Sequence, residues 1–162
     1  MTQPPFRVGL GFDIHPLKEG RPCLLGGVTI PSDVGPDGHS DADVLLHAAA
    51  DALLGAAGLR DIGTIFPNTD PACQGMDSAR ILRRAAEEAS QAGWCVGNLD
   101  VVVVAERPRL SAHVPAMQKR VAEILGIDPS RVGIKATTNE GMDAVGQGRA
   151  LSVHAVCLLF KA

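Results

Sequence analysis

The chain has 162 residues, 46% of them hydrophobic, which is enough for one domain with a hydrophobic core and too few for two. Its formal net charge of −3 argues against a surface that binds the phosphate backbone of a nucleic acid. No apolar run approaches the length needed to span a bilayer, so we expect one soluble, cytoplasmic domain over residues 1–162 that binds neither nucleic acid nor membrane.

The first half of the chain is predicted to form a hairpin followed by a long helix. RVGLGFDIH, residues 7–15, is typical of a strand, and CLLGGVTIP, residues 23–31, is predicted to be its hairpin partner. Ser40 is a suitable N-cap with an acidic residue three positions later, so we expect a helix over residues 41–57. Residues 60–77, rich in Gly, Pro, Asn and Asp, are predicted to be a long loop that is functional or mobile.

The second half of the chain alternates helices with strands. The expected elements are helices over 78–92 and 113–126 and strands over 98–106, 131–138 and 150–160. The strand at 98–106 is almost continuously apolar, which indicates burial on both faces or a subunit contact. This irregular alternation after a hairpin predicts an α+β fold with a mixed four- to five-stranded sheet and three helices.

Three polar residues are spaced four apart on the first predicted helix. Because such residues are offset by only about 40°, Asp43, His47 and Asp51 form one stripe. Apolar residues border the stripe and it has no basic partner, so an unpaired carboxylate there is costly. Two interpretations stay open on the helix alone: a metal site, or a capping residue with a structural histidine.

The end of the first predicted strand adds two candidate ligands. Asp13 and His15 are two apart on a strand, so their side chains point to the same face. With His47 they make two imidazoles and one carboxylate, a set suited to tetrahedral zinc with a fourth position open for water or substrate. We expect Asp43 and Asp51 to accept a hydrogen bond from the other ring nitrogen of His47.

Two further segments have features typical of phosphate contacts. His39 and Ser40 lie in a Gly-rich turn before the predicted helix, where backbone N–H groups attract anions. The KATTNEG segment offers the hydroxyls of Thr137 and Thr138 and the carboxylate of Glu140. A carboxylate among phosphates indicates a hard cation such as Mg²⁺. The same segment is equally compatible with an ordinary strand end and turn.

The remaining histidines and the cysteines are interpreted as structural. His113 opens an amphipathic helix, and His154 lies in the last predicted strand. The cysteines have no CxxC spacing, so we expect reduced, small core residues and no disulfide framework or zinc knuckle. The four are Cys23, Cys73, Cys95 and Cys157.

Several stretches together resemble one enzyme family, in order and over essentially the whole chain. GFDIHPL, the GG of LLGGVTIP, HSDADVLLHAAADALLGAAGLRDIGTIFP, GNLDVVVVAERPRL and KATTNEG are similar to the 2-C-methyl-D-erythritol 2,4-cyclodiphosphate synthases. These enzymes close a cyclic diphosphate on 4-diphosphocytidyl-2-C-methyl-D-erythritol 2-phosphate and release CMP, in the non-mevalonate isoprenoid pathway. The resemblance implies a single catalytic domain over 1–162, ferredoxin-like subunits in a homotrimer with active sites at subunit interfaces, and dependence on zinc and on magnesium or manganese.

The resemblance also implies a role for each residue that matches a family motif. Zinc would be bound by Asp13, His15 and His47, and magnesium or manganese by Glu140; Asp13, His15 and Glu140 would also border the substrate. The methylerythritol and phosphate groups would be contacted by His39, Ser40, Asp61, Gly63, Phe66, Asn68 and Asp70. The cytidine diphosphate would be contacted by Ala105, Arg109, Leu110, Ser111, Thr137 and Thr138. His39 and Thr138 would support the transition state.

The sequence departs from the family pattern at several positions. Asn68 stands where the family commonly has an aspartate, so a contact can persist but a charge is lost. Ala144 replaces an aromatic residue, and Gln147 a basic one, with Arg149 two positions later. Arg109 stands where lysine is more usual. We therefore assign no role to Ala144 or Gln147, and no isoprenoid diphosphate site on the molecular axis.

Two rival functions fit the same residues. A metallo-phosphohydrolase would use the Asp/His/His set to cut a phosphoanhydride with zinc-bound water. A non-catalytic trimer with an altered loop would bind metal and nucleotide without turnover. Product analysis separates them, because only the cyclase yields CMP together with a cyclic diphosphate.

Overall fold

The computed structural model describes residues 4–67 and 69–162. The strands in these ranges are β1 (Phe6–Glu19), β2 (Cys23–Leu25), β3 (Val28–Ile30), β4 (Val34–Pro36), β5 (Trp94–Val104), β6 (Val132–Thr137) and β7 (Ala150–Lys161). The helices are α1 (Val44–Ala57), α2 (Ile62–Ile65), α3 (Ser78–Gln91), α4 (Val114–Leu125) and α5 (Asp143–Gly146), with 3₁₀ turns at Pro71–Cys73, Ser111–His113 and Pro129–Arg131. None of the helices in the two described ranges is long and apolar enough to cross a membrane.

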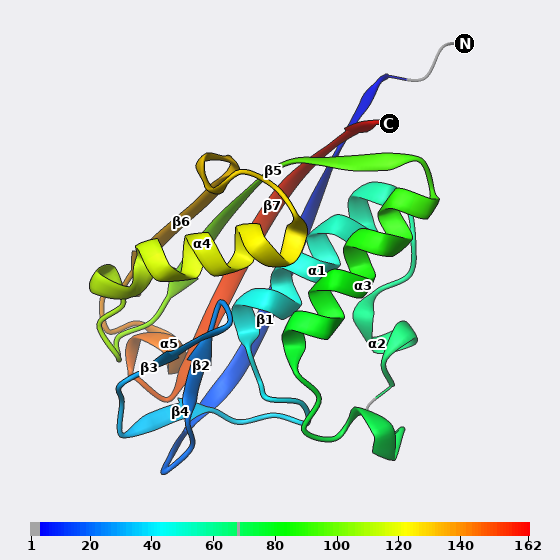
Figure 1. The fold of residues 1–162 in the computed structure, drawn as a ribbon. Helices are drawn as coiled ribbons and strands as arrows, with labels where there is room; N and C mark the ends of the chain where they lie inside the picture. The colour runs from blue at the N-terminus through cyan, green and yellow to red at the C-terminus, as the bar shows by residue number, and fades with distance from the viewer. Residues whose placement is uncertain (1–3, 68) are drawn as a thin grey trace.

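Five strands form one mixed sheet in the order β4-β1-β7-β5-β6 (Figure 1). β5 and β6 run parallel, and the other neighbouring pairs of this sheet are antiparallel. β1 and β7 pair over most of their length, from Phe6 opposite Phe160 to Pro16 opposite Ala150. The predicted α+β class, the mixed five-stranded sheet and the three main helices are confirmed.

The expected hairpin between β1 and residues 23–31 is wrong. β2 and β3 pair with each other, with Cys23 opposite Ile30, and form a separate two-stranded sheet. Gly26 and Gly27 have φ values of 59° and 71°, in a region of backbone conformation that favours glycine. The nine-residue segment therefore reverses on itself, while β1 pairs with β7 and β4.

The expected start of the first helix is also wrong, because Asp43 caps α1 in place of Ser40. The Asp43 carboxylate accepts a hydrogen bond from the N–H of Leu46, at 3.1 Å, inside the helix. It also accepts hydrogen bonds from the N–H groups of Gly26, at 2.9 Å, and Gly27, at 2.7 Å. Burial raises the pKa of Asp43, although these three donors oppose the rise. One buried carboxylate thus joins the β2–β3 turn to the N-terminus of α1.

α1 packs very close to β1 because β1 has glycine where the helix crosses it. A Cβ atom on Gly11 would lie 1.9 Å from the carbonyl oxygen of Ala48, and one on Gly9 would lie 2.0 Å from that of Ala52. Small residues on both elements therefore allow the two backbones to touch. This approach brings together the two elements that carry the candidate metal ligands.

The other predicted elements are confirmed with small shifts. α3 and α4 begin and end within one residue of the expected positions, and Gly126, with φ 66°, follows the end of α4 as expected. β5 begins at Trp94, four residues earlier than expected. Segment 60–77, expected to be a loop, contains the single-turn helix α2, and a second single-turn helix, α5, follows β6; both are too short to show a periodic pattern.

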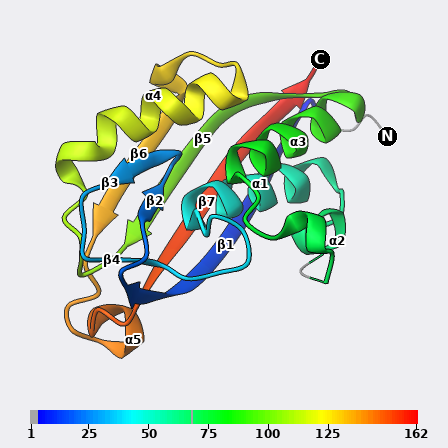
Figure 2. The same cartoon turned by 60° about the horizontal axis from the view of Figure 1, so that its bottom comes forward.

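The three long helices cover one face of the sheet, and the opposite face is exposed along β1 and β7 (Figure 2). The exposed apolar side chains on that face, named here the open-face patch, are Phe6, Val8, Leu10, Phe12, Ile14, Val156 and Phe160. On β1 they alternate with residues that face the helices, among them Gly9, Gly11 and Asp13. Within residues 4–67 and 69–162, the sheet therefore has one packed face and one apolar face that no element covers.

All four cysteines are free, but only two of them are core residues. Cys23 and Cys157 are buried, and burial raises the pKa of each thiol to about 11. Cys73 and Cys95 are half-buried. The expectation that all four are core residues therefore holds for Cys23 and Cys157 alone.

Candidate metal centre and its cavity

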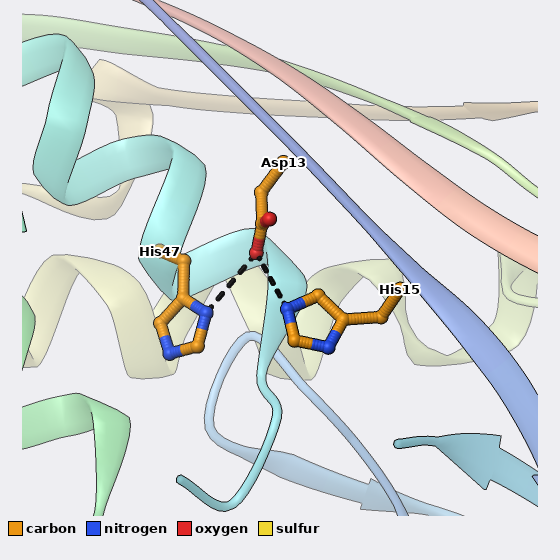
Figure 3. A group of neighbouring side chains, drawn as sticks. All are labelled: Asp13, His15 and His47. Atoms are coloured by element: carbon orange, nitrogen blue, oxygen red, sulfur yellow. Dashed lines mark hydrogen bonds and ion pairs between the residues drawn. The ribbon is translucent and has the colours of Figure 1, made fainter. Parts of the chain in front are cut away.

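Asp13, His15 and His47 lie together where β1 meets the first turn of α1 (Figure 3). Asp13 Oδ2 is 3.1 Å from Nε2 of His15 and 3.1 Å from Nδ1 of His47. The three candidate ligand atoms all lie within 4.8 Å of one another. Residues 34 positions apart in the chain thus form one cluster, named here the Asp-His-His cluster.

The tautomer of His15 follows from its contact with the backbone. Nδ1 of His15 lies 2.8 Å from the carbonyl oxygen of Asp37, which only accepts, so Nδ1 carries a proton and donates. A neutral His15 then directs the lone pair of Nε2 at Asp13 Oδ2, which is also an acceptor. Gly38 leaves room for this ring, because a Cβ atom there would lie 2.4 Å from His15 Cε1. A proton or a cation is required between the two facing acceptors.

The electrostatics of the Asp-His-His cluster fit a divalent cation. Burial raises the pKa of Asp13, but the hydrogen bonds and positive charge of His15 and His47 outweigh burial and hold that pKa well below its usual range. The hydrogen bond to Asp13 raises the pKa of His15, and burial opposes the rise. The Asp13 carboxylate is thus ionised and needs a positive partner. Two imidazoles and one carboxylate are a donor set that zinc prefers.

The second ring nitrogen of His47 has different partners from those expected. Nε2 lies 2.9 Å from Oγ of Ser78 and 3.1 Å from Oγ of Ser40. The expectation that Asp43 and Asp51 would accept from it is wrong. Backbone N–H groups at the start of α1 occupy Asp43, and Asp51 accepts a hydrogen bond at 2.9 Å from the first N–H of α2.

A cavity of about 270 Å³ opens beside the Asp-His-His cluster, close to the lower size limit of small-molecule sites. Its lining residues are Asp13, His15, His39, Ser40, His47, Asp51, Ile62, Gly63, Phe66, Cys73, Met76 and Ile81. Beyond the three ligands, four of these residues were predicted from the sequence to contact substrate: His39, Ser40, Gly63 and Phe66. Apolar side chains from α2, α3 and the segment between them complete the wall, so the cavity has both a charged and an apolar surface.

Two more predicted residues, Asp61 and Asp70, belong to the segment around α2 and lie outside this lining. Asp61 caps α2 and accepts hydrogen bonds from the N–H and the hydroxyl of Thr64, at 2.9 and 2.8 Å. These bonds lower the pKa of Asp61. Asp70 caps the following 3₁₀ turn by accepting from the N–H of Ala72 at 2.9 Å. Asn68 lies outside the described residues.

The residues predicted to contact cytidine diphosphate form a second group at the ends of the parallel strands β5 and β6. The N–H of Ala105 donates to the carbonyl oxygen of Thr137 at 2.9 Å. The carboxylate of Glu106 accepts from the N–H of Asn139 at 3.0 Å, which joins the two loops. The hydroxyl of Thr138 donates to the Glu140 carboxylate at 3.2 Å. The other members are Arg109 and Ser111, which are exposed, and Leu110, which is buried.

The two groups are separate within one subunit. β7 lies between β1 and β5 in the sheet, so two to three strand spacings, roughly 10–14 Å, separate β1 from the two strands that carry the second group. Across the described chain, the cavity lining contains no member of the second group. The Asp-His-His cluster and the residues predicted to contact nucleotide are therefore not brought together within the described chain.

Ser78 and Glu106 contact these groups but were not predicted from the sequence. Ser78 is the first residue of α3, next to the N-cap Asp77, so its position in the sequence carries no signal of a second role. Glu106 follows a strand like any polar loop residue. Only the tertiary fold shows that each meets a functional segment more than 30 positions away.

Comparisons with known proteins agree with this geometry. The model of the YgbB family matches residues 6–160. A 2-C-methyl-D-erythritol 2,4-cyclodiphosphate synthase of Synechococcus sp. (strain JA-2-3B'a(2-13)) is 54% identical over 155 residues, which cover 96% of this chain and 99% of that protein. The IspF CDP complex of Plasmodium falciparum is 34% identical with a TM-score of 0.86, and 99% of each chain is covered.

The bifunctional IspDF of Campylobacter jejuni is 38% identical with a TM-score of 0.94; the match covers 97% of this chain and 42% of that longer one. The fold, the full-length coverage and the high identity to the Synechococcus relative all point to one family. The chain belongs to the YgbB family.

Proposed function

We propose that this chain converts 4-diphosphocytidyl-2-C-methyl-D-erythritol 2-phosphate to 2-C-methyl-D-erythritol 2,4-cyclodiphosphate and CMP, as a phosphorus–oxygen lyase of the non-mevalonate isoprenoid pathway. One observation carries the proposal: the Asp-His-His cluster opens into a cavity, in a chain that is 54% identical to a 2-C-methyl-D-erythritol 2,4-cyclodiphosphate synthase. The same proposal makes residues 1–162 one catalytic domain that works in the cytoplasm.

The reaction needs no side-chain nucleophile. A phosphate monoester has a second pKa of about 6 and is mostly dianionic at neutral pH. The 2-phosphate of the substrate can therefore attack the terminal phosphorus of the CDP group, and CMP departs with the electrons of the broken bond. The protein must hold the two phosphorus groups in line and reduce the repulsion among their charges.

The Asp-His-His cluster would hold zinc. The donor set fits, because the Asp13 carboxylate is ionised and His15 directs an unprotonated nitrogen at it. A zinc ion bound there would supply positive charge beside the phosphate oxygens and help to orient them. The chain's own residues, Asp13, His15 and His47, would fix where that charge lies.

The remaining cavity residues would bind and orient the methylerythritol part of the substrate. His39 and Ser40 would contact the phosphates, and His39 would also support the transition state. Asp61, Gly63 and the segment Phe66–Asp70 would contact the methylerythritol carbons and hydroxyls. The apolar wall formed by residues such as Ile62 and Met76 supports this assignment, because a methyl-bearing carbon chain suits an apolar surface.

The second group would bind the cytidine and its diphosphate. Residues Ala105 to Ser111 would surround the cytosine, and Thr137 and Thr138 would contact the diphosphate, with Thr138 supporting the transition state. Glu140 would hold magnesium or manganese beside the leaving CMP. The hydrogen bond from Thr138 to Glu140 supports a joint role for these two residues. The relative from Plasmodium falciparum is described as a CDP complex, which supports the nucleotide assignment.

A homotrimer of ferredoxin-like subunits would bring the two groups together at each subunit interface. Two observations support it. The metal group and the nucleotide group are separate in one subunit, and the open-face patch leaves Leu10 67% exposed and Val8 62% exposed. Contiguous apolar surface of this kind is typical of subunit contacts. Packing three such sheets face to face would bury the open-face patch.

The products formed by the purified protein test the proposed function. Incubation of the substrate with protein, Zn²⁺ and Mg²⁺ should give CMP and the cyclic diphosphate in equal amounts, as measured by phosphorus NMR. Free phosphate or linear diphosphate products would instead identify a hydrolase, and no product with bound nucleotide would identify a binding scaffold.

His47→Ala provides the matched variant for this assay. Loss of one of three ligands should remove zinc from the purified protein and abolish turnover, while circular dichroism shows the native fold. His113→Ala is the control, because His113 lies at the start of α4, outside the cavity lining of the described residues. Normal turnover by metal-free His47→Ala protein would reject the role of the Asp-His-His cluster.

A further inference from the structure

We infer that Ser78 and Asp41 form a hydrogen-bonded relay that fixes the tautomer of His47 and so prepares its Nδ1 atom to bind a divalent cation. The inference rests on the proposed metal-binding role of the Asp-His-His cluster. Ser78 and Asp41 act through His47, so they are positioning residues. Neither was predicted from the sequence as a site residue, although Asp41 lies within the HSDADV motif.

The relay is built from buried and fully engaged groups. Ser78 has no exposed surface, and its Oγ lies 2.9 Å from Nε2 of His47. The same hydroxyl makes a short hydrogen bond to Asp41 Oδ1. The Asp41 carboxylate also accepts from the N–H of Ser78 at 2.9 Å and from the N–H of Asp43 at 3.1 Å. Asp41 thus joins the start of α1 to the start of α3.

The number of available protons determines which atom donates in each hydrogen bond of the relay. A serine hydroxyl has a single proton, and Ser78 donates it to the Asp41 carboxylate, which only accepts. The contact between Ser78 Oγ and Nε2 of His47 therefore requires a proton on Nε2. Ser40 Oγ, 3.1 Å from the same nitrogen, already accepts from the N–H of Ala42 and has a further lone pair for the imidazole proton.

A proton on Nε2 of His47 leaves the other ring nitrogen, Nδ1, without one. With its proton on Nε2, a neutral His47 directs the lone pair of Nδ1 at Asp13 Oδ2, 3.1 Å away. His15 directs the lone pair of Nε2 at the same oxygen because the carbonyl of Asp37 binds its other nitrogen. Both imidazoles are thus held in the tautomer that a metal ion requires. The opposite tautomer of His47 would place a proton where the ion binds.

Zinc affinity tests the relay without any use of turnover. Competition against a chromophoric chelator should show that Ser78→Ala binds Zn²⁺ about tenfold to a hundredfold more weakly than the wild type. Ser78→Thr keeps the hydroxyl and should restore most of the affinity. Asp41→Asn should also weaken binding, because an amide cannot accept from all three of the N–H and O–H donors that face Asp41.

Asp77→Ala is the matched control for damage to the start of α3. Asp77 caps this helix by accepting from the N–H of Ala79 at 2.8 Å, and it is adjacent to Ser78. Its removal should lower stability and leave zinc affinity within about twofold of the wild type. Equal zinc affinity in Ser78→Ala and the wild type would overturn the relay.

The tautomer can also be observed directly in the unmodified protein. In ¹⁵N NMR spectra of metal-free protein near pH 8, the ring proton of neutral His47 should be on Nε2. A proton on Nδ1 would overturn the inference even if every variant failed to fold. This measurement therefore keeps the test independent of the substitutions.

These results separate the relay from the proposed function. Wild-type protein that binds zinc but forms no cyclic diphosphate would reject the proposed reaction, and the zinc titrations would still decide the relay. Wild-type protein that binds no zinc would overturn both. Weaker zinc binding in Ser78→Ala, with rescue by threonine and the expected tautomer, would establish the relay whatever the reaction proves to be.

Discussion

At the scale of single residues, the two oxygens of Asp13 have different partners. Oδ1 accepts a hydrogen bond from the N–H of Ile14 at 2.9 Å, which holds the carboxylate in one orientation. Oδ2 faces both imidazoles of the Asp-His-His cluster at 3.1 Å. The local backbone bond thus leaves one oxygen for the histidines and for a cation, and the charge of this carboxylate decides how the cluster responds to pH.

The first prediction concerns the pH dependence of stability in metal-free protein. Asp13 has a lowered pKa, so its contribution is present above its ordinary value of 3.8 and is lost as the pH falls through the folded value. His15 has a raised pKa, so its contribution is present below 6.5 and is lost as the pH rises through the folded value. The difference in unfolding free energy between wild type and Asp13→Asn should therefore be largest between these two values.

Urea unfolding in the presence of a chelator, repeated across this pH range, measures that difference. In saturating zinc this difference should rise with pH above 6.5, whereas it falls in metal-free protein. Zinc binds a neutral His15, so it stabilises the folded wild type more strongly as His15 loses its proton. A difference that stays constant from acid to alkaline pH would show that the interaction between Asp13 and His15 contributes nothing.

The second prediction concerns the reactivity of the thiols. Cys23 and Cys157 are buried with a pKa of about 11, so at pH 8 they have on the order of a hundredfold less thiolate than an ordinary cysteine. Cys73 is half-buried in the cavity wall and should react with iodoacetamide much faster, as measured by mass spectrometry of the labelled peptides. Substrate in the cavity should slow Cys73 and leave Cys95 unaffected. Labelling of Cys157 at the rate of Cys73 would contradict the burial argument.

At the scale of elements, the contact between β1 and α1 determines whether a metal site exists. Gly9 and Gly11 on the strand face Ala48 and Ala52 on the helix, and this match of small residues sets the distance between the elements. His47 reaches Asp13 only because the backbones touch. The geometry of the site is therefore sensitive to side-chain volume at positions of β1 and α1 that carry no ligand.

Gly11→Ala tests this dependence. A Cβ atom would lie 1.9 Å from the carbonyl oxygen of Ala48, so the helix must move away, at a cost of about 1–3 kcal/mol or more in unfolding free energy. Zinc affinity should fall as well, because His47 moves with the helix. Gly55→Ala is the control in α1: no atom lies within 4 Å of the added Cβ, and we expect about 0.5–1 kcal/mol of stabilisation. Urea unfolding and zinc titration check both variants, and unchanged values for Gly11→Ala would refute close packing as the cause.

The helices and strands also show which parts of the fold and of the candidate site can be predicted from sequence patterns. Long periodic segments predicted α3 and α4 to within a residue, because helix propensity and an apolar face agree there. The two-residue spacing of Asp13 and His15 and the family motif around His47 predicted the cluster. The partners of β1 and of Asp43 were mispredicted, because hairpin pairing and capping depend on which backbone groups compete in three dimensions. Contacts such as that of Ser78 are purely tertiary and leave no pattern in the chain.

At the scale of the whole molecule, the subunit has two incomplete groups and one uncovered apolar face. The Asp-His-His cluster lies on the helix side of β1, and the residues proposed to bind the nucleotide lie at the ends of β5 and β6. Association through the open-face patch would bury the exposed side chains of β1 and β7 and place the groups of neighbouring subunits together. Assembly and activity should therefore depend on the same surface.

Leu10→Asp tests this link between assembly and activity. Its side chain is 67% exposed in the single chain, so an aspartate should leave the isolated fold intact but would be buried without a partner in the proposed trimer. Light scattering should show that the variant is monomeric. These monomers should still bind zinc but should have little turnover. Arg83→Asp is the control, because it introduces the same charge at an exposed position of α3, on the opposite side of the sheet from the open-face patch. This variant should remain trimeric and active. Trimers formed by Leu10→Asp would exclude the open-face patch as the interface.

The alternation along β1 has a consequence for how this chain can vary. Asp13 and His15 face α1, while Phe12 and Ile14 face the opposite side, so two unrelated requirements interleave over four consecutive positions. One inserted or deleted residue in this strand would exchange the two sets, sending phenylalanine and isoleucine toward the helix and the ionisable groups toward the outside. Length changes are thus excluded from β1 even where individual substitutions are harmless, and descendants of this sequence should differ in length only in their loops.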